Sequence, residues 1–493
     1  MQQRNDSEKP KAAEGTTVRG DEITTDICVI GAGSGGLSVA AAAAAFGVGV
    51  VLIEKHKMGG DCLNYGCVPS KALLAAGKRA KLMRSSSAFG ITPVEPEIDF
   101  AKVNAHVKSV IAAIEPNDSV ERFTGLGVHV IQAAAKFVDK YTVQAGEQTI
   151  KARRFVIATG SSPMVPPIPG LADTPHFTNE TLFDNTQRPE HLIIVGGGPI
   201  GMEMAQAHRR LGAQVTVLEG QKAMGKDDPE LARHVLDAME AEGITIREGA
   251  MVQSVAGSAG AIDVTIKTDT GEETVHGTHL LVAAGRKPNI DGLGLDVAGI
   301  KHDKRGISVN KSLVTSNKKV FAIGDCIGGL QFTHVANYHA GLVIRQALFK
   351  LPVKVNDGII PWVTFTDPEL AHVGLTEAEA RQQKGGNISV LRWPYHENDR
   401  AQAELVTSGF VKAITDKKGR ILGATIVGHN AGELIQMWSL AISQKMKIKA
   451  LTDWISPYPT LTEVNKRAAY RFYSNAASSP VVRKVVNFMR SLG

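Results

Sequence analysis

The sequence predicts an α/β fold built around two doubly wound parallel sheets. Two stretches of sequence predict these sheets. Each has the order strand, glycine loop, helix and strand, and one lies near the N-terminus and the other after residue 190. The 493-residue chain also has room for two to four domains at roughly 100–200 residues each. Its hydrophobic and charged shares, 43% and 21%, are ordinary for a globular protein.

The first pattern lies in DICVIGAGSGGLSVAAAAAAFGVGVVLIE, residues 26–54. Two apolar runs, Ile27–Ile30 and Val48–Ile53, predict strands on either side of an alanine-rich helix. The loop before the helix carries Gly31, Gly33 and Gly36. Such glycines let the backbone approach a pyrophosphate at the helix N-terminus, and Glu54 follows where a carboxylate can bind the ribose hydroxyls. The segment predicts a dinucleotide site, and a glycine-rich packing turn is the alternative.

The second pattern, HLIIVGGGPIGMEMAQAHRRLGAQVTVLEG, repeats the first. Its loop glycines are Gly196, Gly198 and Gly201. The second strand ends at Glu219, so 23 residues separate the first glycine from the acid in both patterns (31 to 54 and 196 to 219). Two such Rossmann-like units indicate two bound nucleotides. A carboxylate at Glu219 favours NADH, because it would repel the 2′-phosphate of NADPH, and only the nearby Lys222 favours that phosphate.

Two of the four cysteines stand together in GGDCLNYGCVPSKALL, residues 59–74. A close pair of thiols in a chain otherwise poor in cysteine indicates redox or metal chemistry. The alternatives for Cys62 and Cys67 are a structural disulfide and half of a zinc site. A zinc site needs about four ligands, and only His56 is close in sequence. We therefore predict no metal site.

Charge and hydropathy exclude several classes of function. The net charge is +6 with no run of lysine or arginine, which argues against nucleic-acid binding. No apolar run is long enough to span a membrane. The polar residues 1–22 lack the features of a signal or transit peptide and predict a disordered tail. Four cysteines do not make a disulfide scaffold, so we expect a cytoplasmic protein.

Taken together, these motifs resemble the FAD-dependent pyridine nucleotide–disulfide oxidoreductases (class I), and in particular dihydrolipoamide dehydrogenase and mercuric reductase. The resemblance spans roughly residues 24–470 and rests first on GGDCLNYGCVPSK, in which Asp61 stands where threonine is commoner. Further matching stretches are ATGSSP (158–163), GRKPN (285–289), VFAIGDC (320–326) and PWVTFTDPELAHVGLTEAEA (361–380).

The resemblance implies that the first unit binds FAD and the second binds NAD. The implied FAD residues are Gly31, Gly33, Gly36, Glu54, Lys71, Thr159, Gly160 and Asp325, and the implied NAD residues are Gly196, Gly198, Gly201, Glu219 and Gly285. A C-terminal α+β domain would form a homodimer. The implied boundaries are 1–22 (tail), 23–160 (FAD-binding, first part), 161–284 (NAD-binding), 285–352 (FAD-binding, second part), 353–475 (dimer interface) and 476–493 (C-terminal tail).

The resemblance also implies catalytic roles and a place in cell redox homeostasis. Electrons would pass from NADH through the flavin to a Cys62–Cys67 disulfide and on to an acceptor. Cys67 would lie against the flavin as a thiolate, and Cys62 would attack the substrate. Lys71 would sit near the flavin, paired with Glu203, although a surface ion pair is the alternative for these two residues.

The chain departs from the family at the catalytic base. The expected His-Pro-Thr-x-x-Glu motif, which reaches the partner subunit's active site, reads Tyr-Pro-Thr-x-x-Glu here, with Tyr458 in the histidine's place and Glu463 retained. A phenol, with a pKa near 10, does not shuttle protons at neutral pH as imidazole does. Mercuric reductases also carry tyrosine there, but they use a C-terminal cysteine pair, whereas the last cysteine here is Cys326.

The final stretch, VVRKVVNFMRSLG, predicts an amphipathic helix. It could pack on the dimer or make a peripheral membrane contact. For the whole chain we expect a dihydrolipoamide dehydrogenase-like, NADH-dependent oxidoreductase acting on a small-molecule disulfide, dithiol or other acceptor. The alternatives are a mercuric, soft-metal or quinone reductase, and a non-catalytic flavoprotein sensor.

Overall fold

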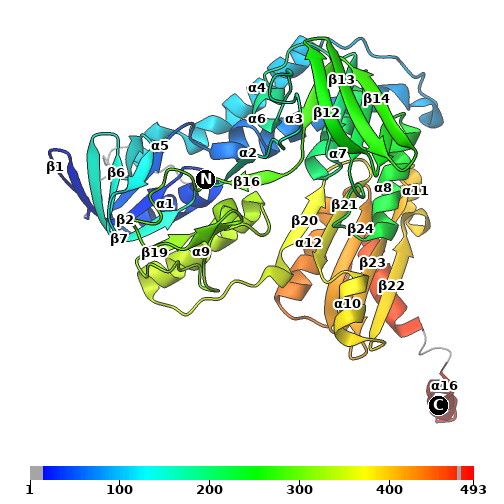
Figure 1. Ribbon diagram of the computed structural model, residues 1–493. Coiled ribbons are helices and arrows are strands. Elements are labelled where there is room, and N and C mark those ends of the chain that lie inside the picture. Colours follow the sequence, from blue (N-terminus) through cyan, green and yellow to red (C-terminus); the bar gives the residue numbers. More distant parts are fainter. Residues whose placement is uncertain (1–14, 475–478, 493) are drawn as a thin grey trace. The chain divides into compact units, whose positions relative to one another are not determined.

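Figure 1 shows a computed structural model of the chain, which describes residues 15–474 and 479–492. The described residues form two compact units. The first unit contains residues 15–190, 254–262 and 277–355, and the second contains 191–253, 263–276 and the rest of the chain from 356. This division keeps residues 161–190 with the first glycine loop, whereas the sequence places them in the NAD-binding domain. The three-domain boundaries remain a prediction.

The main sheet of the first unit is parallel at its centre. Its strand order is β4-β3-β2-β7-β6-β5, with β19 also paired to β7. Strands β2, β3, β4, β7 and β19 pair in parallel, and β5 and β6 join the edge in antiparallel pairing. The strands are β2 (Glu22–Ile30), β3 (Val50–Glu54), β4 (His129–Gln132), β5 (Ala135–Phe137), β6 (Thr142–Ala145), β7 (Gln148–Ile157) and β19 (Val320–Ala322).

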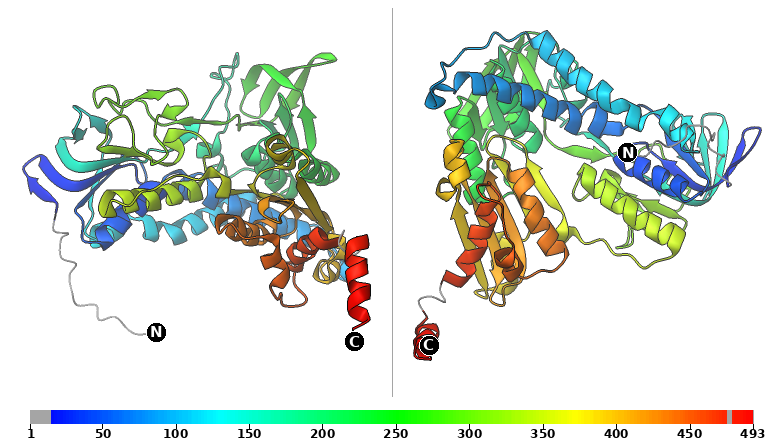
Figure 2. Two further views of the ribbon diagram at one scale, coloured as in Figure 1. Left: turned by 90° about the horizontal axis from the view of Figure 1, so that it is seen from below. Right: turned by 180° about the vertical axis from the view of Figure 1, so that it is seen from behind.

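The alternation of side chains along β2 gives this sheet two buried faces. Ile27 and Val29 pack with α1 (Ser34–Ala45) and α9 (Thr333–Phe349), two helices that lie side by side (Figure 2). Cys28 and Ile30 point into the other core. Residues i and i+2 of a strand share a face, so an uninterrupted apolar run fits a strand that is covered on both sides.

The other helices of the first unit follow the sheet strands or connect them. They are α2 (Gly60–Asn64), α3 (Cys67–Arg84), α4 (Phe100–Ile114), α5 (Val120–Gly125) and α6 (Asn179–Leu182), with the 3-10 helices η1 (Ser87–Phe89), η2 (Glu115–Asp118) and η3 (Gly324–Ile327). Two small two-stranded sheets join β8 (Ser161–Pro163) to β16 (Arg286–Pro288) and β17 (His302–Asp303) to β18 (Gly306–Ile307). The remaining strand of this unit is β15 (His279–Val282), and three strands are divided between the units: β12 (Met251–Ser258), β13 (Ala261–Thr268) and β14 (Gly271–Gly277).

The prediction that residues 1–22 form a disordered tail is wrong for the last residues of this range. Strand β1 (Thr17–Arg19) turns at Gly20 and pairs antiparallel with the start of β2, and the Thr16 and Thr25 hydroxyls lie 2.9 Å apart. The strand has only three residues, all of them exposed, so hydropathy could not reveal it. Residues 1–14 lie outside the described part of the chain.

The second unit begins with a parallel sheet of order β11-β10-β9. Its elements are β9 (His191–Val195), α7 (Pro199–Arg210), β10 (Gln214–Glu219), α8 (Pro229–Ala241) and β11 (Thr245–Glu248). Each crossover between neighbouring strands contains a helix, as parallel pairing requires. The second glycine-loop pattern therefore forms the βαβ unit that the sequence predicts.

The rest of the second unit is an antiparallel sheet covered by helices. The strand order is β20-β21-β24-β23-β22, and α12 (Ala431–Ser443) packs on β21 and β24 (Figure 1). Its core includes Trp438, whose indole N–H donates to Asn465 Oδ1 at 2.8 Å. The strands are β20 (Pro361–Thr364), β21 (Glu369–Gly374), β22 (Ile388–Pro394), β23 (Gly409–Asp416) and β24 (Ile421–Gly428). The other helices are α10 (Glu377–Lys384), α11 (Asp399–Ala403), α13 (Ile448–Asp453), α14 (Glu463–Tyr470) and α16 (Pro480–Arg490), with η4 (Asp357–Ile359), η5 (Tyr395–Glu397) and η6 (Arg471–Tyr473).

Candidate active site

The two cysteines of the redox motif lie at the starts of consecutive helices. Cys62 is in the first turn of α2, and Cys67 is the first residue of α3. The loop that leads into α2 is held by the Asn64 side-chain amide, which donates to the carbonyls of Met58 and Gly60 at 3.0 and 2.9 Å. Both residues are free thiols in the structure, with Cys62 half-buried and Cys67 exposed. Free N–H groups at a helix start favour a thiolate, so the local fold favours ionisation of Cys67.

The surroundings shift the pKa values of the two thiols in opposite directions. The Cys62 thiol donates a hydrogen bond to Cys67. This bond, the Thr333 hydroxyl and the Lys71 ammonium together lower the pKa of Cys67 to about 6, although the surrounding protein atoms partly desolvate the thiol and oppose this effect. The same hydrogen bond, followed by burial, raises the pKa of Cys62. At neutral pH the pair therefore holds one proton, on Cys62, and one negative charge, on Cys67.

The sequence reasoning did not name Thr333, which lies beside Cys67. Its hydroxyl lies 3.5 Å from Cys67 Sγ, although 266 residues separate the two. Thr333 begins α9, the helix that packs against α1, so the contact depends on the tertiary fold. No local spacing in the sequence pointed to it.

Replacing Thr333 with Val should raise the pKa of Cys67. A hydrogen bond to a charged acceptor is worth about 1.5 kcal/mol, which corresponds to about one pH unit. Because a thiolate is the reactive form, alkylation of Cys67 in the reduced protein should shift to higher pH in this variant. Peptide-resolved alkylation between about pH 5 and 9, a range that includes both the ordinary and the lowered thiol pKa, measures the pH midpoint of Cys67 alkylation. Thr333→Ser, which keeps the hydroxyl, is the control, and an unchanged midpoint in Thr333→Val would contradict the assignment.

Asp61, the residue that departs from the family motif, is part of a polar network. The Asn179 side-chain amide donates to Asp61 Oδ1 at 3.0 Å, and Arg286 Nη2 lies 3.1 Å from the same oxygen. Arg286 also donates to the Ser161 hydroxyl at 2.7 Å, and that hydroxyl donates to Asp325 Oδ2 at 2.7 Å. The network connects the redox helix to two other motifs, ATGSSP and VFAIGDC. Asp61 also opposes ionisation of both cysteines through its charge.

The first glycine loop forms a cradle that fits a pyrophosphate. A Cβ on Gly36 would lie 1.8 Å from the carbonyl oxygen of Gly31, which itself has φ +103°. Gly33 caps α1 without a side-chain hydrogen bond, so the first N–H groups of the helix remain available to an anion. The Glu54 carboxylate accepts from the backbone N–H groups of Ala32 and His56 at 2.7 and 2.8 Å. These bonds fix Glu54 beside the loop.

Two further motifs close around the same loop. The Thr159 hydroxyl donates to the carbonyl of Asn289 at 2.6 Å, and the Asn289 backbone N–H donates to the Gly160 carbonyl at 2.9 Å. Burial raises the pKa of Asp325, while the Ser161 hydroxyl and the Arg286 charge oppose that rise. The structure thus brings the predicted FAD residues together in the first unit.

The second glycine loop has the same local geometry. A Cβ on Gly201 would lie 2.0 Å from the Gly196 carbonyl oxygen, and Gly198 caps α7 without a side-chain bond. The Glu219 carboxylate accepts from the N–H groups of Gly197 and Gln221, both at 2.8 Å, and so repeats the arrangement of Glu54. Gly285, the other predicted NAD residue, belongs to the first unit, where its carbonyl accepts from Met164 N at 2.9 Å.

Lys71 and Glu203 belong to different units, so their pairing stays a prediction. Within its own unit, Lys71 Nζ lies 3.4 Å from the Ser70 hydroxyl and acts electrostatically on Cys67. Glu203 is buried in α7, where it accepts from the Phe365 backbone N–H at 3.0 Å.

Tyr458 bonds to a carboxylate that the sequence reasoning did not name. Its hydroxyl donates to Asp399 Oδ2 at 2.8 Å, and this bond and the Asp399 charge raise the pKa of Tyr458. Glu463, expected behind Tyr458, forms an ion pair with Arg467 at 2.9 Å. Tyr458 is 70% exposed. Its phenol is therefore a hydrogen-bond donor at neutral pH and cannot take up a proton.

Comparison with known proteins identifies the family. The model of the pyridine nucleotide-disulphide oxidoreductases matches residues 25–340, and the model of their dimerisation domain matches residues 360–469. The chain belongs to this family. It is an FAD-dependent pyridine nucleotide–disulfide oxidoreductase, and the predicted fold class and enzyme class are confirmed.

The oxidoreductase is similar to enzymes that are named for different activities. A mercuric reductase of Lysinibacillus sphaericus is 34% identical over 92% of this chain and 83% of its own. A dihydrolipoyl dehydrogenase of Staphylococcus aureus is 36% identical over 91% and 96% of the two chains. The Cu(II) complex of the HOCl-induced flavoprotein disulfide reductase RclA from Escherichia coli has a TM-score of 0.80 at 28% identity, covering 89% of this chain and 98% of that one.

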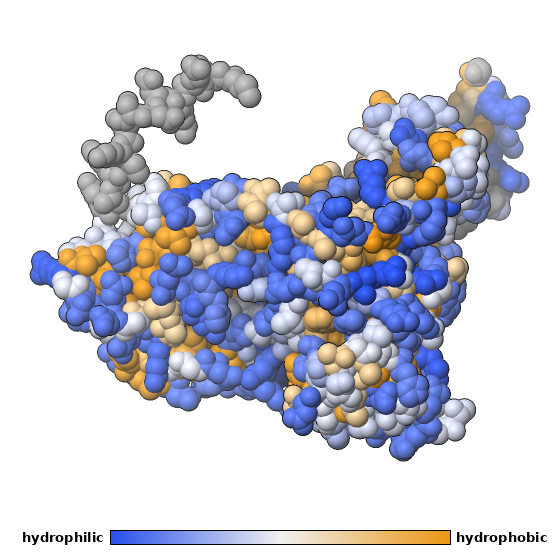
Figure 3. Space-filling view, turned by 90° about the horizontal axis from the view of Figure 1, so that it is seen from above, coloured by the Kyte–Doolittle hydropathy of each residue, from blue (hydrophilic) through white to orange (hydrophobic). Residues whose placement is uncertain are grey.

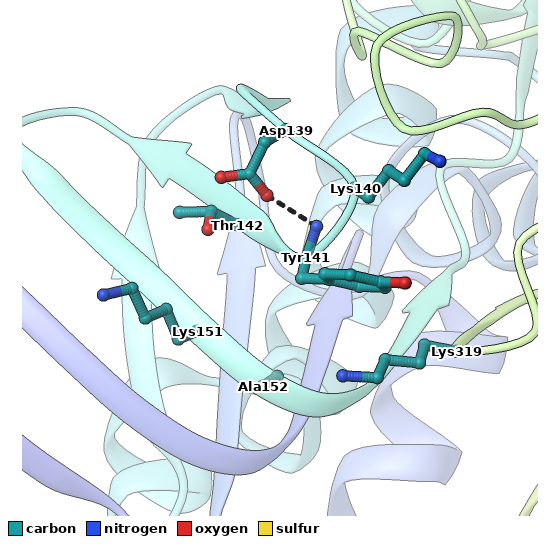
Figure 4. Close-up of a pocket in the computed structure, with 7 residues that line it drawn as sticks. All are labelled: Asp139, Lys140, Tyr141, Thr142, Lys151, Ala152 and Lys319. Atoms are coloured by element: carbon teal, nitrogen blue, oxygen red, sulfur yellow. Dashed lines mark hydrogen bonds between the residues drawn. The ribbon is translucent and has the colours of Figure 1, made fainter.

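Outside the candidate site, the described residues include two buried cysteines and a surface pocket. Burial raises the pKa of Cys28, and it raises the pKa of Cys326 to about 11, so both are inert thiols. The pocket, of about 490 Å³, is drawn in Figure 4. Its lining residues are Asp139, Lys140, Tyr141, Thr142, Lys151, Ala152 and Lys319. Lys319 Nζ lies 4.2 Å from the centre of the Tyr141 ring, and none of the predicted site residues lines this pocket.

Within residues 15–474 and 479–492, no three His, Cys, Asp or Glu side chains gather as metal ligands would. Across the same ranges, no helix has the length and apolar character needed to cross a bilayer.

Proposed function

We propose that this oxidoreductase uses NADH and passes electrons through Cys62 and Cys67 to a small thiophilic acceptor, with a soft metal ion as the preferred class. Bound FAD supplies two-electron transfer between the nicotinamide and the cysteine pair. The residues that would hold it are the first glycine loop, Glu54, Thr159–Gly160 and Asp325. Cys67 holds the negative charge of the reduced pair, Lys71 offsets that charge, and Cys62 attacks the acceptor.

The preference for NADH rests on Glu219 and Lys222. The Glu219 carboxylate is fixed at the end of β10 by two backbone N–H groups, where it would repel a 2′-phosphate. Lys222, the nearby cation that could attract the phosphate, donates instead to Glu248 Oε2 at 2.9 Å. Its charge is offset by this pair, which favours NADH.

Replacing Glu219 with Ala should narrow the preference for NADH over NADPH by at least about tenfold. The variant loses a charge-assisted hydrogen bond to the ribose of NADH and the repulsion of the phosphate, and bonds of this kind contribute about 1.5–3 kcal/mol. The ratio of the kcat/KM values for NADH and NADPH measures this preference. Lys222→Gln is the matched control and should leave the ratio unchanged, whereas an unmodified protein that prefers NADPH would overturn the cofactor proposal.

The proposed acceptor class rests on one observation, the hydrogen bond from Tyr458 to Asp399. A dithiol substrate must lose protons to a base, and a phenol whose pKa is raised cannot accept them. A soft metal ion bound by thiolates needs no such base. NADH would give up two electrons and become NAD⁺ and a proton. These two electrons would reduce one divalent metal ion to the neutral metal. The likeness to mercuric reductases and to RclA supports this class.

A panel of acceptors tests the acceptor class. NADH consumption should be faster with Hg(II) in excess thiol than with lipoamide by at least about tenfold, the low side of a general acid–base contribution. Lipoamide is reduced in this assay, so its leaving thiolates must be protonated, and a phenol whose pKa is raised is a poor proton donor. Menadione tests the quinone alternative. Faster turnover with lipoamide than with either of the others would overturn the proposal, and a protein that consumes no NADH with any of them would favour a sensor.

We also propose a cytoplasmic homodimer. The match to the dimerisation domain supports the dimer. In the family's arrangement, the region of Tyr458 would complete the active site of the partner subunit, so the dimer is the catalytic form. Light scattering of the purified protein measures the mass.

A further inference from the structure

The C-terminal helix α16 exposes all of its side chains. It spans Pro480–Arg490, and none of its residues is buried against the rest of the chain. The exposed fractions are high for large apolar side chains, at 69% for Val481, 63% for Phe488 and 61% for Met489. On the face drawn in Figure 3, hydrophobic side chains elsewhere occur in scattered patches among hydrophilic ones. An exposed helix with so many apolar residues indicates a surface that another partner covers.

The apolar residues of α16 share one side of the helix. At about 100° per residue, they occupy an arc of about 160°. The residues in this arc, including Leu492 just after the helix, are Val481, Val482, Val485, Val486, Phe488, Met489 and Leu492. The opposite side carries Pro480 at the start of the helix and otherwise polar and cationic residues: Arg483, Lys484, Asn487, Arg490 and Ser491.

The charges on this helix all have one sign. Arg483 and Arg490 border one edge of the apolar arc, and Lys484 borders the other. After Glu463 the sequence contains six cationic side chains and no acidic one. A helix with a broad apolar face flanked by cations is suited to the boundary between acyl chains and anionic headgroups. Cations on both edges would instead repel one another if two such helices packed together in parallel.

We propose that α16 binds the surface of anionic lipid membranes, with its apolar face in the acyl boundary and its cations on the headgroup phosphates. This inference does not depend on the proposed acceptor or nucleotide preference, because none of the residues involved belongs to the candidate active site. It would place the enzyme at a membrane surface without a spanning segment. The alternative, docking on a second copy of the chain, is an outcome of the test.

Sedimentation of the full-length, FAD-loaded protein with vesicles tests the proposal. Vesicles of phosphatidylcholine and phosphatidylglycerol should bind it at least about tenfold more tightly than vesicles of phosphatidylcholine alone, since each cation near an anionic surface contributes favourably. Raising the salt concentration should reduce this difference, because the headgroup contacts are exposed and screened.

Three variants separate the contributions of the apolar arc and of the cations to vesicle binding. Val485→Glu should abolish binding, because it puts a charge in the apolar arc, and the triple variant Arg483→Gln, Lys484→Gln, Arg490→Gln should remove the preference for anionic vesicles. Asn487→Gln changes a neutral residue on the polar side and should bind as the unmodified protein does. All of these variants should keep NADH oxidation, which shows that they fold and carry FAD.

Two results would overturn the proposal. The first is absence of binding to anionic vesicles, or binding that Val485→Glu leaves unchanged. The second is a lower molecular mass of Val485→Glu in light scattering, which would show that α16 packs against a second copy.

Discussion

The partly reduced protein should show a long-wavelength absorbance band, and the Cys67→Ser variant should lose this band while it retains FAD. In the family, this band comes from a thiolate beside the cofactor, and the structure favours Cys67 as the thiolate because the Cys62 thiol, Thr333 and Lys71 all stabilise its charge. Acceptor turnover should fall by at least about 10³-fold, as with the loss of other nucleophilic residues. Absorbance spectra during anaerobic reduction measure the band.

Cys62→Ser provides the matched control. A serine hydroxyl can still donate to Cys67, so the band should persist in this variant although turnover is lost. The band should also depend on pH, because only the thiolate form of Cys67 produces it. It should be present well above pH 6 and disappear as Cys67 is protonated below about 6. A band that survives in Cys67→Ser would show that the two roles are exchanged.

The Tyr458→His variant should oxidise dihydrolipoamide at least about tenfold faster than the unmodified protein, the low side of a general acid–base contribution. An imidazole has a pKa near 6.5 and can accept a proton at neutral pH, unlike the phenol it replaces. The structure shows which carboxylate could orient it, because the Tyr458 hydroxyl already donates to Asp399. The rate at which NADH reduces the enzyme should not change.

A second substitution tests the role of Asp399. Adding Asp399→Asn to Tyr458→His should remove most of the gain if this carboxylate orients the imidazole, whereas Glu463 should matter less because it is paired with Arg467. Two results would count against the account. One is efficient dihydrolipoamide oxidation by the unmodified protein, and the other is a histidine variant that gains nothing while it remains dimeric and loaded with FAD.

The features that the sequence could predict are those with a local signal. The two glycine loops with their acids and the cysteine pair each lie within one short segment. In such motifs the spacing of the residues determines their local geometry. The buried faces of β2 likewise follow from its uninterrupted apolar run. The family and its fold could therefore be inferred from these short segments alone.

The features that the sequence could not predict are those built by distant segments. Thr333 reaches Cys67 across 266 residues, and Arg286 joins Asp61 to Ser161 through contacts that only the fold creates. Asp399 lies 59 residues from Tyr458, with no motif of its own. Strand β1 was missed for another reason, because an exposed strand of three residues has no hydrophobic pattern to detect.

Counting thiols in denaturant, before and after reduction by NADH, tests the central claim most directly. The chain has four cysteines, of which Cys28 and Cys326 are buried and inert. If NADH delivers two electrons to a Cys62–Cys67 disulfide, the air-oxidised protein should show two titratable thiols and the NADH-reduced, acid-quenched protein should show four. A count that NADH does not change would contradict the account, because the cysteine pair would then not lie on the path of the electrons.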